Sequence, residues 1–215
     1  WVKDALAGLG IWVRSFPHRP EIADGLRITC PGNEQGHTRL HSALRAALAP
    51  EALLFDLDGV LADVSGSYRE AIRQTAAGYG VGVGAEEISV AKAAGNANND
   101  WELTRMLLAH HGAAAPLDDL IQRFEELYQG TSKRPGLHEN ERLTVPVDLI
   151  ARWAARFPLA VVTGRPRMDA LRFLGRFDLA RFFGVIICLD DAPAKPDPTG
   201  VRLALTRLGV RRAWM

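Results

Sequence analysis

Short runs of consecutive apolar residues divide the second part of the chain. Three of them, at 53–55, 159–164 and 185–190, are rich in Leu, Val and Ile, and a polar loop follows each. Runs of this length are typical of strands that are buried on both faces of a parallel sheet. Helical patterns occupy the intervals 146–157 and 167–177. Strands that alternate with helices predict an α/β fold with a Rossmann-like parallel sheet and right-handed crossovers.

The interval between the first two predicted strands is much longer than a simple crossover requires. A β-α-β unit takes about 30 residues, whereas Asp58 and Thr163 are 105 positions apart. The extra length contains three segments with apolar residues at positions i, i+3 and i+4, which are 67–80, 99–112 and 116–130. This spacing predicts helices. We therefore expect residues 66–143 to form an inserted helical cap on a core made of residues 51–65 and 144–215.

Residues 1–50 follow a different pattern, in the order helix, strand, strand, helix. Two short β-rich runs at 10–16 and 25–30 are separated by two prolines and a glycine, and a segment with helical spacing follows at 33–48. Asn33 is placed to cap that helix. A small α+β segment of this kind is expected to bury too little surface to be stable alone.

Composition and charge exclude several classes of protein. The chain of 215 residues carries 26 basic and 25 acidic residues, a formal net charge of +1, so nothing indicates a nucleic-acid partner or a membrane surface. No apolar run approaches the roughly 18 residues that a membrane-spanning helix needs. Cys30 and Cys188 are too few for a disulfide scaffold, and both are predicted to be buried thiols in strand-like runs. Because no secretory signal is visible at the start, we expect a reducing, cytoplasmic compartment.

Two carboxylates directly follow the first predicted strand. Asp56 and Asp58 are two positions apart, so an extended backbone would direct both side chains to one side. Ligands of an open parallel sheet bind beyond the carboxyl ends of its strands, and Gly59 allows the chain to turn there. Two close carboxylates suit Mg²⁺, and an aspartate can also act as a nucleophile toward phosphorus. The alternative is a simple turn or a calcium loop, although apolar residues stand where an EF-hand would need further acids.

Polar residues also follow the other two predicted strands. Thr163 and Gly164 precede the helix at 167–177, where a hydroxyl and backbone N–H groups can cradle an anion. Lys195 stands in a proline-constrained loop after the third strand, where an ammonium can neutralise a carboxylate and a phosphoryl group. Each feature taken alone is also compatible with an ordinary turn. The three sites occur in order, each at the end of a predicted strand, which favours one shared phosphate site.

This ordered set resembles the haloacid-dehalogenase-like (HAD) hydrolase superfamily, in the helical-cap subgroup IA. The motifs that carry the resemblance are DLDGVLAD at 56–63, VVTG at 161–164 and KPDP at 195–198. The resemblance implies that Asp56 is the nucleophile and a Mg²⁺ ligand. It implies that Asp58 is the general acid and base, with its backbone carbonyl on the metal, and that Thr163 and Lys195 bind the phosphoryl group. Because the dehalogenases of the superfamily lack the second aspartate, Asp58 favours phosphoester hydrolysis.

The sequence departs from the superfamily at its fourth motif. That motif is a further strand followed by Gly-Asp and additional acids, which complete the metal site. Here the last strand begins near 211–215, where the sequence ends, and the nearby Asp190 and Asp191 precede Lys195. We therefore expect a fragment of a longer protein, with weak or no activity as an isolated chain.

Residues 10–48 resemble the C-terminal end of fold-type I aminotransferases, especially histidinol-phosphate aminotransferase, through GLRIT followed by a glycine turn and a capped helix. The resemblance implies that Arg27 once bound a substrate anion, and that pyridoxal phosphate would belong only to an upstream domain. A fused aminotransferase and phosphatase could catalyse consecutive steps of histidine biosynthesis. This makes histidinol phosphate the candidate substrate.

Specificity is expected from the cap. Asn98, Asn99 and Trp101 belong to a polar stretch that could face a small phosphorylated metabolite. The alternative is that Asn99 caps a helix and Trp101 packs inside the cap. The predicted function is a Mg²⁺-dependent phosphatase with a phospho-aspartyl intermediate. The alternatives are a sugar-phosphate mutase of the same superfamily or a non-catalytic module fused to an aminotransferase. The sequence does not specify the oligomeric state.

Overall fold

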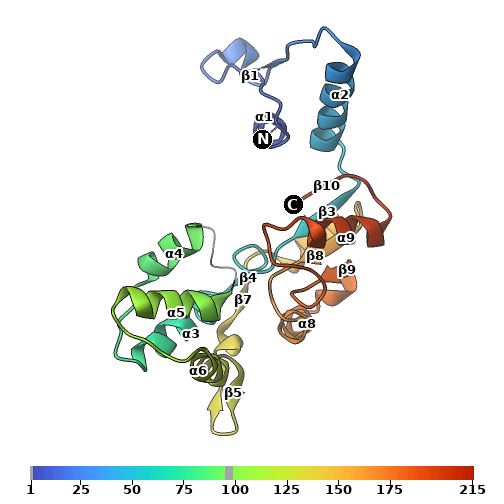
Figure 1. Cartoon of the computed structure of the whole chain (residues 1–215). Helices are drawn as coiled ribbons and strands as arrows, with labels where there is room; N and C mark the ends of the chain where they lie inside the picture. The colour runs from blue at the N-terminus through green and yellow to red at the C-terminus, as the bar shows by residue number, and fades with distance from the viewer. Residues whose placement is uncertain (1, 95–98) are drawn as a thin grey trace.

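The computed structural model describes residues 2–94 and 99–215, and a four-stranded parallel sheet lies at its centre (Figure 1). The strands follow the order β10-β3-β8-β9, so the first strand of the sheet along the chain lies inside it. The prediction of a parallel α/β sheet is confirmed. The strand bounds are β3 (Ala52–Phe55), β8 (Leu159–Val162), β9 (Phe183–Ile187) and β10 (Ala213–Trp214).

Helices cover both faces of this sheet, because the side chains of β8 alternate between two buried clusters. Leu159 and Val161 join the large cluster to which helices α7 and α8 contribute. Ala160 and Val162 point the other way and pack in the cluster that contains Ala204 of helix α9. Strand β8 is therefore buried along its whole length, as its continuous apolar run predicts. The helices around the sheet are α7 (Val147–Ala154), α8 (Arg167–Arg176), η3 (Ala180–Phe182) and α9 (Thr199–Leu208).

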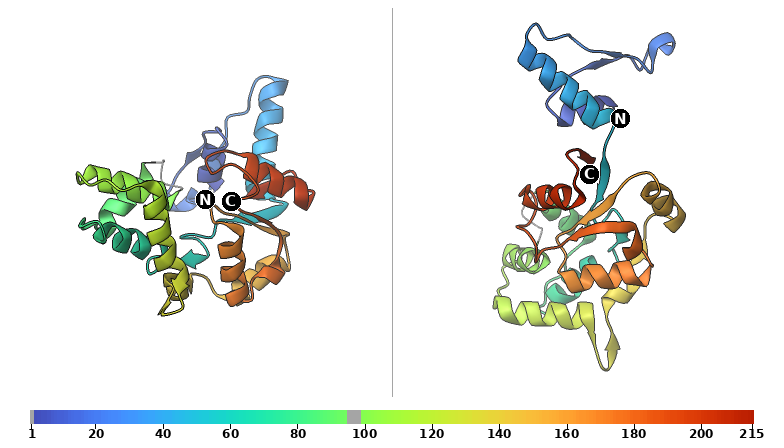
Figure 2. Two further views of the ribbon diagram at one scale, coloured as in Figure 1. Left: turned by 60° about the horizontal axis from the view of Figure 1, so that its bottom comes forward. Right: turned by 90° about the vertical axis from the view of Figure 1, so that its right-hand side faces the viewer.

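Four helices between β4 and β7 pack together beside the sheet (Figures 1 and 2). Three of them were expected from the sequence, whereas α4 was not. Only Ile88 of α4 is buried, and Val90 is 65% exposed, so its apolar residues do not form one stripe. The bounds are α3 (Tyr68–Ala77), α4 (Ala85–Ala93), α5 (Asp100–His110) and α6 (Leu117–Gln129).

The chain enters and leaves this helical region at one place. Strand β4 (Ala62–Asp63) pairs antiparallel with β7 (Arg142–Leu143), so the two crossings lie side by side. Between α6 and β7 the chain forms a small hairpin and a single 3-10 turn. These elements are β5 (Gly130–Thr131), β6 (Arg134–Pro135) and η2 (Leu137–Asn140).

The first fifty residues stand apart from the sheet and are joined to it beyond α2 (Figures 1 and 2). The expected order of helix, strand, strand and helix is confirmed, and Asn33 caps the last helix by accepting a bond from Gly36 N–H at 2.7 Å. Trp214 Nε1–H donates to the carbonyl of Ala46 at 2.8 Å and ties α2 to the sheet edge. The elements are α1 (Val2–Gly8), β1 (Arg14–Ser15), η1 (Pro20–Ile22), β2 (Leu26–Arg27) and α2 (Glu34–Leu48).

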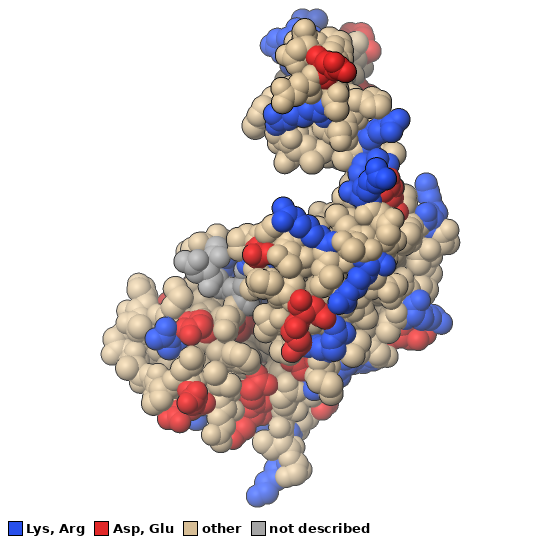
Figure 3. All heavy atoms as spheres, turned by 45° about the vertical axis from the view of Figure 1, so that its right-hand side comes forward, with Lys and Arg blue, Asp and Glu red and all other residues tan. Residues whose placement is uncertain are grey.

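Surface charge and the burial of the two cysteines were also predicted from the sequence. Acidic and basic side chains are mixed over the face in Figure 3, in keeping with the small net charge. Among the described residues, no helix has the length and apolar character to cross a membrane. Cys188 is buried as expected, but the prediction for Cys30 was wrong. Cys30 is exposed because β2 ends at Arg27 and the chain runs on as a loop.

Candidate active site

A cavity of about 570 Å³ opens where β3, β8 and β9 end, between the sheet and the inserted helices. Loops that follow the three strands line one side of it, and α3, α4, α5 and α6 line the other. Residues on the sheet side are Asp56, Asp58, Gly164, Arg165 and Lys195, and residues on the helical side include Tyr68, Lys92, Asp100, Trp101 and Glu125. The carboxyl ends of parallel strands are the expected place for a ligand.

Asp56 and Lys195 form a close ion pair in this cavity. Asp56 directly follows β3, and its Oδ2 lies 2.6 Å from Lys195 Nζ. The backbone N–H of Leu57 donates to the other oxygen, Oδ1, at 2.8 Å. Lys195 also donates to the carbonyl of Val162 at 3.3 Å, so it links the ends of two neighbouring strands. Both side chains of the pair remain about a third exposed, 31% for Lys195 and 30% for Asp56.

Asp58 pairs with a different cation. Both Nε and Nη2 of Arg165 lie 2.7 Å from its Oδ1. Burial raises the pKa of Asp58 above the ordinary 3.8, because loss of water disfavours the carboxylate, and Arg165 offsets only part of this effect. Burial also acts to lower the pKa of Arg165, but the charge of Asp58 raises it overall, so the guanidinium stays charged.

Arg165 is held from behind by a buried glutamate. Its Nη1 donates to Glu141 Oε2 at 2.9 Å, and the side chains of Arg165 and Glu141 are 1% and 3% exposed. The other oxygen of Glu141, Oε1, accepts bonds from Ser67 at 3.0 Å and Tyr128 at 3.2 Å. Neither Arg165 nor Glu141 was predicted from the sequence. Arg165 was detectable as the charge that follows Thr163 and Gly164, whereas no local pattern distinguishes Glu141.

Thr163 lies just behind the cavity rather than in its wall. It is 5% exposed, and its Oγ1 accepts a bond from the backbone N–H of Arg165 at 3.2 Å. Its own N–H donates to the carbonyl of Ile187 in β9 at 2.9 Å. Gly164 follows in the wall itself. The predicted phosphate-binding residues Thr163, Gly164 and Lys195 are therefore near one another. The hydroxyl of Thr163, however, bonds the backbone of the loop that follows β8.

The residues predicted to set specificity fall in different places. Asn99 caps α5, since its Oδ1 accepts bonds from the N–H groups of Trp101 at 3.0 Å and Glu102 at 3.3 Å. Asn99 and Trp101 also line the cavity, so Asn99 both caps α5 and faces the cavity. Asn98 lies outside the described residues. Arg27 is exposed in β2 and does not belong to the cavity wall.

Asp190 and Asp191 stabilise the loop after β9 and are absent from the cavity wall. Asp190 accepts a bond from the N–H of Arg167 at 2.7 Å, at the start of α8. Asp191 accepts from the N–H of Cys188 at 2.8 Å and pairs with the Arg167 guanidinium. Burial raises the pKa of the Cys188 thiol to about 11, so it is not a nucleophile near neutral pH.

The charges in the cavity indicate whether a divalent cation fits. Asp56 and Asp58 are balanced by Lys195 and Arg165, so a phosphate dianion would arrive without compensation. The carboxylate of Asp56 and the backbone carbonyl of Asp58 are hard oxygen donors of the kind that Mg²⁺ uses, together with substrate phosphate and water. The donor set therefore fits Mg²⁺.

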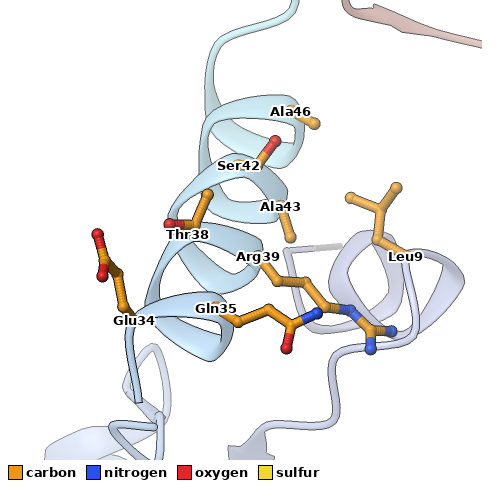
Figure 4. Close-up of a pocket in the computed structure, with 8 residues that line it drawn as sticks. All are labelled: Leu9, Glu34, Gln35, Thr38, Arg39, Ser42, Ala43 and Ala46. Carbon is orange, nitrogen blue, oxygen red and sulfur yellow. The ribbon is translucent and has the colours of Figure 1, made fainter.

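Other clusters lie away from this cavity. At the end of α5, the exposed His111 and His110 lie near one carboxylate, with His111 Nε2 2.8 Å and His110 Nδ1 3.7 Å from Glu87 Oε1. Figure 4 shows an open groove between α2 and Leu9, which follows α1. The guanidinium of Arg39 in this groove donates to the carbonyl of Gly10 at 3.4 Å. The groove wall contains a single carboxylate, whereas the cavity on the sheet contains the aspartate pair.

The fold and the cavity together define an α/β protein with a parallel sheet and two aspartates in a cavity at the ends of its strands. The chain belongs to the haloacid dehalogenase-like hydrolase family, whose model matches residues 50–215. This confirms the superfamily that the three motifs indicated, and with it the class of enzyme. The match begins after α2, so the resemblance of residues 10–48 to aminotransferases stays a prediction, as does the subgroup.

The relatives of the chain include phosphatases of small phosphorylated compounds. An imidazoleglycerol-phosphate dehydratase of Phytophthora nicotianae is 47% identical over 166 residues, which are 74% of this chain and 37% of that protein. The chain thus spans little more than a third of this relative. A phosphorylated carbohydrates phosphatase of Thermotoga maritima is 30% identical over 74% of this chain and 71% of its own length. The crystal structure of CbbY from Rhodobacter sphaeroides in complex with phosphate has a TM-score of 0.56 at 28% identity, with 76% of each chain covered.

Proposed function

We propose that the protein is a Mg²⁺-dependent phosphatase that acts through a phospho-aspartyl intermediate on Asp56. The observation that carries this proposal is the arrangement of Asp56 against Lys195, with Asp58 in the same cavity at the ends of β3 and β9. A carboxylate beside a fixed ammonium can attack an incoming phosphoryl group, because the ammonium neutralises part of the negative charge of both groups.

The reaction has two displacement steps. An oxygen of Asp56 attacks phosphorus while the bond from phosphorus to the leaving oxygen breaks, and Asp58 gives its proton to that oxygen. Water then attacks the aspartyl phosphate, Asp58 takes the proton of that water, and the carboxylate of Asp56 and inorganic phosphate are released. The raised pKa of Asp58 suits it to the first step, because it must be protonated at the start.

Mg²⁺ would be held by the carboxylate of Asp56 and by the backbone carbonyl of Asp58. When bound, it would neutralise charge on the transferring phosphoryl group. Lys195 and the backbone of Gly164 would hold the remaining phosphoryl oxygens, and Thr163 would position that backbone through its bond to the next residue.

The helical side of the cavity supports histidinol phosphate as the substrate. We propose that α3 to α6 form the specificity cap. Glu125 accepts bonds from two neutral donors, Trp101 Nε1–H at 3.1 Å and Gln129 Nε2–H at 3.0 Å, and no cation among the described residues forms an ion pair with it. Such a carboxylate beside an indole can bind a cationic imidazole or amine. The name of the 47% identical relative also specifies a phosphorylated imidazole compound.

The proposal is tested on the purified full-length protein with Mg²⁺ and a panel of phosphoesters. Acid-quenched protein should carry phosphate on Asp56, and beryllium fluoride with Mg²⁺ should block labelling. Glu125→Gln should raise KM for histidinol phosphate and leave KM for simple sugar phosphates unchanged. A protein without phosphate on Asp56 would be a non-catalytic module, and a rate for histidinol phosphate no higher than for generic esters would overturn the substrate.

A sugar-phosphate mutase is the second candidate. It is favoured by a crystal structure of a candidate β-phosphoglucomutase from Thermotoga maritima, with a TM-score of 0.54 at 29% identity, which covers 75% of this chain and 72% of that one. A mutase would transfer the phosphoryl group back to a sugar, so its turnover would depend on added sugar bisphosphate. Phosphate release without bisphosphate would exclude it.

A further inference from the structure

Arg165 is the most deeply buried charge in the cavity wall. The residue is 2% exposed, and its guanidinium carbon lies over two aromatic rings, 5.1 Å from the centroid of Tyr68 and 5.2 Å from that of Phe173. These two contacts restrict the guanidinium through cation–π attraction and packing. Arg165 is therefore a rigid element rather than a mobile surface charge.

The edge of the same guanidinium connects two carboxylates from distant parts of the chain. Nε and Nη2 lie 2.7 Å from Asp58 Oδ1, and Nη1 lies 2.9 Å from Glu141 Oε2. Glu141 is anchored in turn by Ser67, which precedes α3, and by Tyr128 of α6. The orientation of Asp58 thus depends on residues at the base of the inserted helices.

The geometry restricts where the proton of Asp58 can reside. A guanidinium only donates hydrogen bonds, so the oxygen that faces it must remain an acceptor. Both contacts fall on Oδ1. A protonated Asp58 next to Arg165 would consequently carry its hydrogen on Oδ2.

We propose that Arg165 is a positioning residue, which holds Oδ1 of Asp58 and thereby assigns the transferable proton to Oδ2. Glu141 holds Arg165 in place for this purpose. The inference rests on the proposed role of Asp58 as general acid. It adds that the acid is oriented by a fixed cation, which is itself secured from the inserted helices.

The leaving group provides the decisive test. A nitrophenolate departs without a proton, whereas an alkoxide needs one, so loss of a well-placed acid slows phosphoryl transfer to Asp56 only for the second kind of substrate. Arg165→Lys keeps the charge but loses the Nε–H bond to Oδ1 and the contact of Nη2 with the same oxygen. The value to compare is kcat/KM, which reports phosphoryl transfer and not the later hydrolysis that both substrates share. We expect kcat/KM for an alkyl phosphate to fall by about 30-fold or more, which is less than the roughly 10²–10⁴-fold of a whole general acid because Asp58 itself remains, and kcat/KM for p-nitrophenyl phosphate to fall less than about 3-fold.

Two further variants keep the test independent of folding. Glu141→Gln preserves the shape of the anchor and should give a weaker loss with the same selectivity, even if Arg165→Lys does not fold. Arg176→Lys is the matched control, because Arg176 donates to the carbonyls of His138 and Glu139 near the same crossing and does not line the cavity. It should leave the ratio of the two substrates unchanged.

A double substitution separates positioning from general stabilisation. In an Asp58→Asn background no acid remains to be oriented, so Arg165→Lys should add no further selective loss. An equal loss for both substrates, or a selective loss that persists in the Asp58→Asn background, would overturn the inference. A wild-type protein that fails to phosphorylate Asp56 with either substrate would instead remove the proposed function, and the role of Arg165 with it.

Discussion

The buried network around Glu141 makes a direct prediction about stability. Glu141→Ala removes a side chain that is 3% exposed and accepts bonds from Ser67 at 3.0 Å, Tyr128 at 3.2 Å and Arg165 at 2.9 Å. Two buried hydroxyl groups and one buried guanidinium would each lose a partner. Because breaking a buried ion pair strands the remaining charge, the expected cost is about 3–5 kcal/mol of unfolding free energy.

An exposed ion pair on helix α7 provides the control. Arg152 and Asp148 lie 3.6 Å apart, with side chains that are 71% and 75% exposed. Water and salt screen such a pair, so Asp148→Ala should cost less than about 1 kcal/mol. The two variants therefore differ by several-fold in expected cost, although each removes one acidic partner of an arginine.

The measurements are urea unfolding, with the midpoint and the slope fitted for each variant, and thermal unfolding, both followed by circular dichroism. A loss of about 4 kcal/mol would lower the melting temperature by roughly 8–16 °C for a chain of this size. If Glu141→Ala and Asp148→Ala lower the free energy of unfolding by the same small amount, then the buried network around Arg165 does not stabilise the protein, and the prediction is refuted.

Three other predictions concern the two aspartates of the site and the two cysteines. Asp56→Asn should abolish phosphoenzyme formation and turnover while the free energy of unfolding stays within about 1 kcal/mol of wild type, as measured by mass spectrometry and urea unfolding. Because burial raises the pKa of Asp58, the protonated acid persists above pH 3.8, and kcat/KM for an alkyl phosphate should fall only as pH rises through that higher value. The pH profile should lose this limb in Asp58→Asn. Iodoacetamide should label the exposed Cys30 and not the buried Cys188 in the folded protein, and peptide mapping would detect the opposite pattern.

Much of the sheet could be predicted from the sequence because its physics is local. The run at 159–164 is apolar on both faces, and its side chains divide between two clusters as a buried parallel strand requires. Helix α4 could not be predicted in the same way. Its apolar residues include the buried Ile88 and the exposed Val90, so no single stripe marks it. Cys30 was misjudged for a related reason, since the apolar run around it pairs over only two residues.

The candidate site was predictable only in part. Asp56, Asp58 and Lys195 each follow an apolar run, so a sheet with parallel strands must bring them to one edge. Arg165 and Glu141 meet across 24 positions, and Arg165 and Asp58 across 107, and no periodic pattern encodes such contacts. These contacts depend on how the inserted helices are joined to the sheet. Only the structure, through the pairing of β4 with β7, shows that arrangement.

The two aspartates of the cavity differ in the cation that accompanies them. Lys195 is 31% exposed on its side chain, so water and a phosphoryl group can reach its ammonium as well as Asp56 can. The Arg165 side chain is 1% exposed and is held by cation–π contacts with two aromatic rings and by its ion pair with Glu141. A nucleophile needs a cation that can be shared with the incoming phosphate, because its own charge is consumed when the bond forms. A proton donor needs a cation that stays in place, because its orientation must be the same before and after the proton leaves.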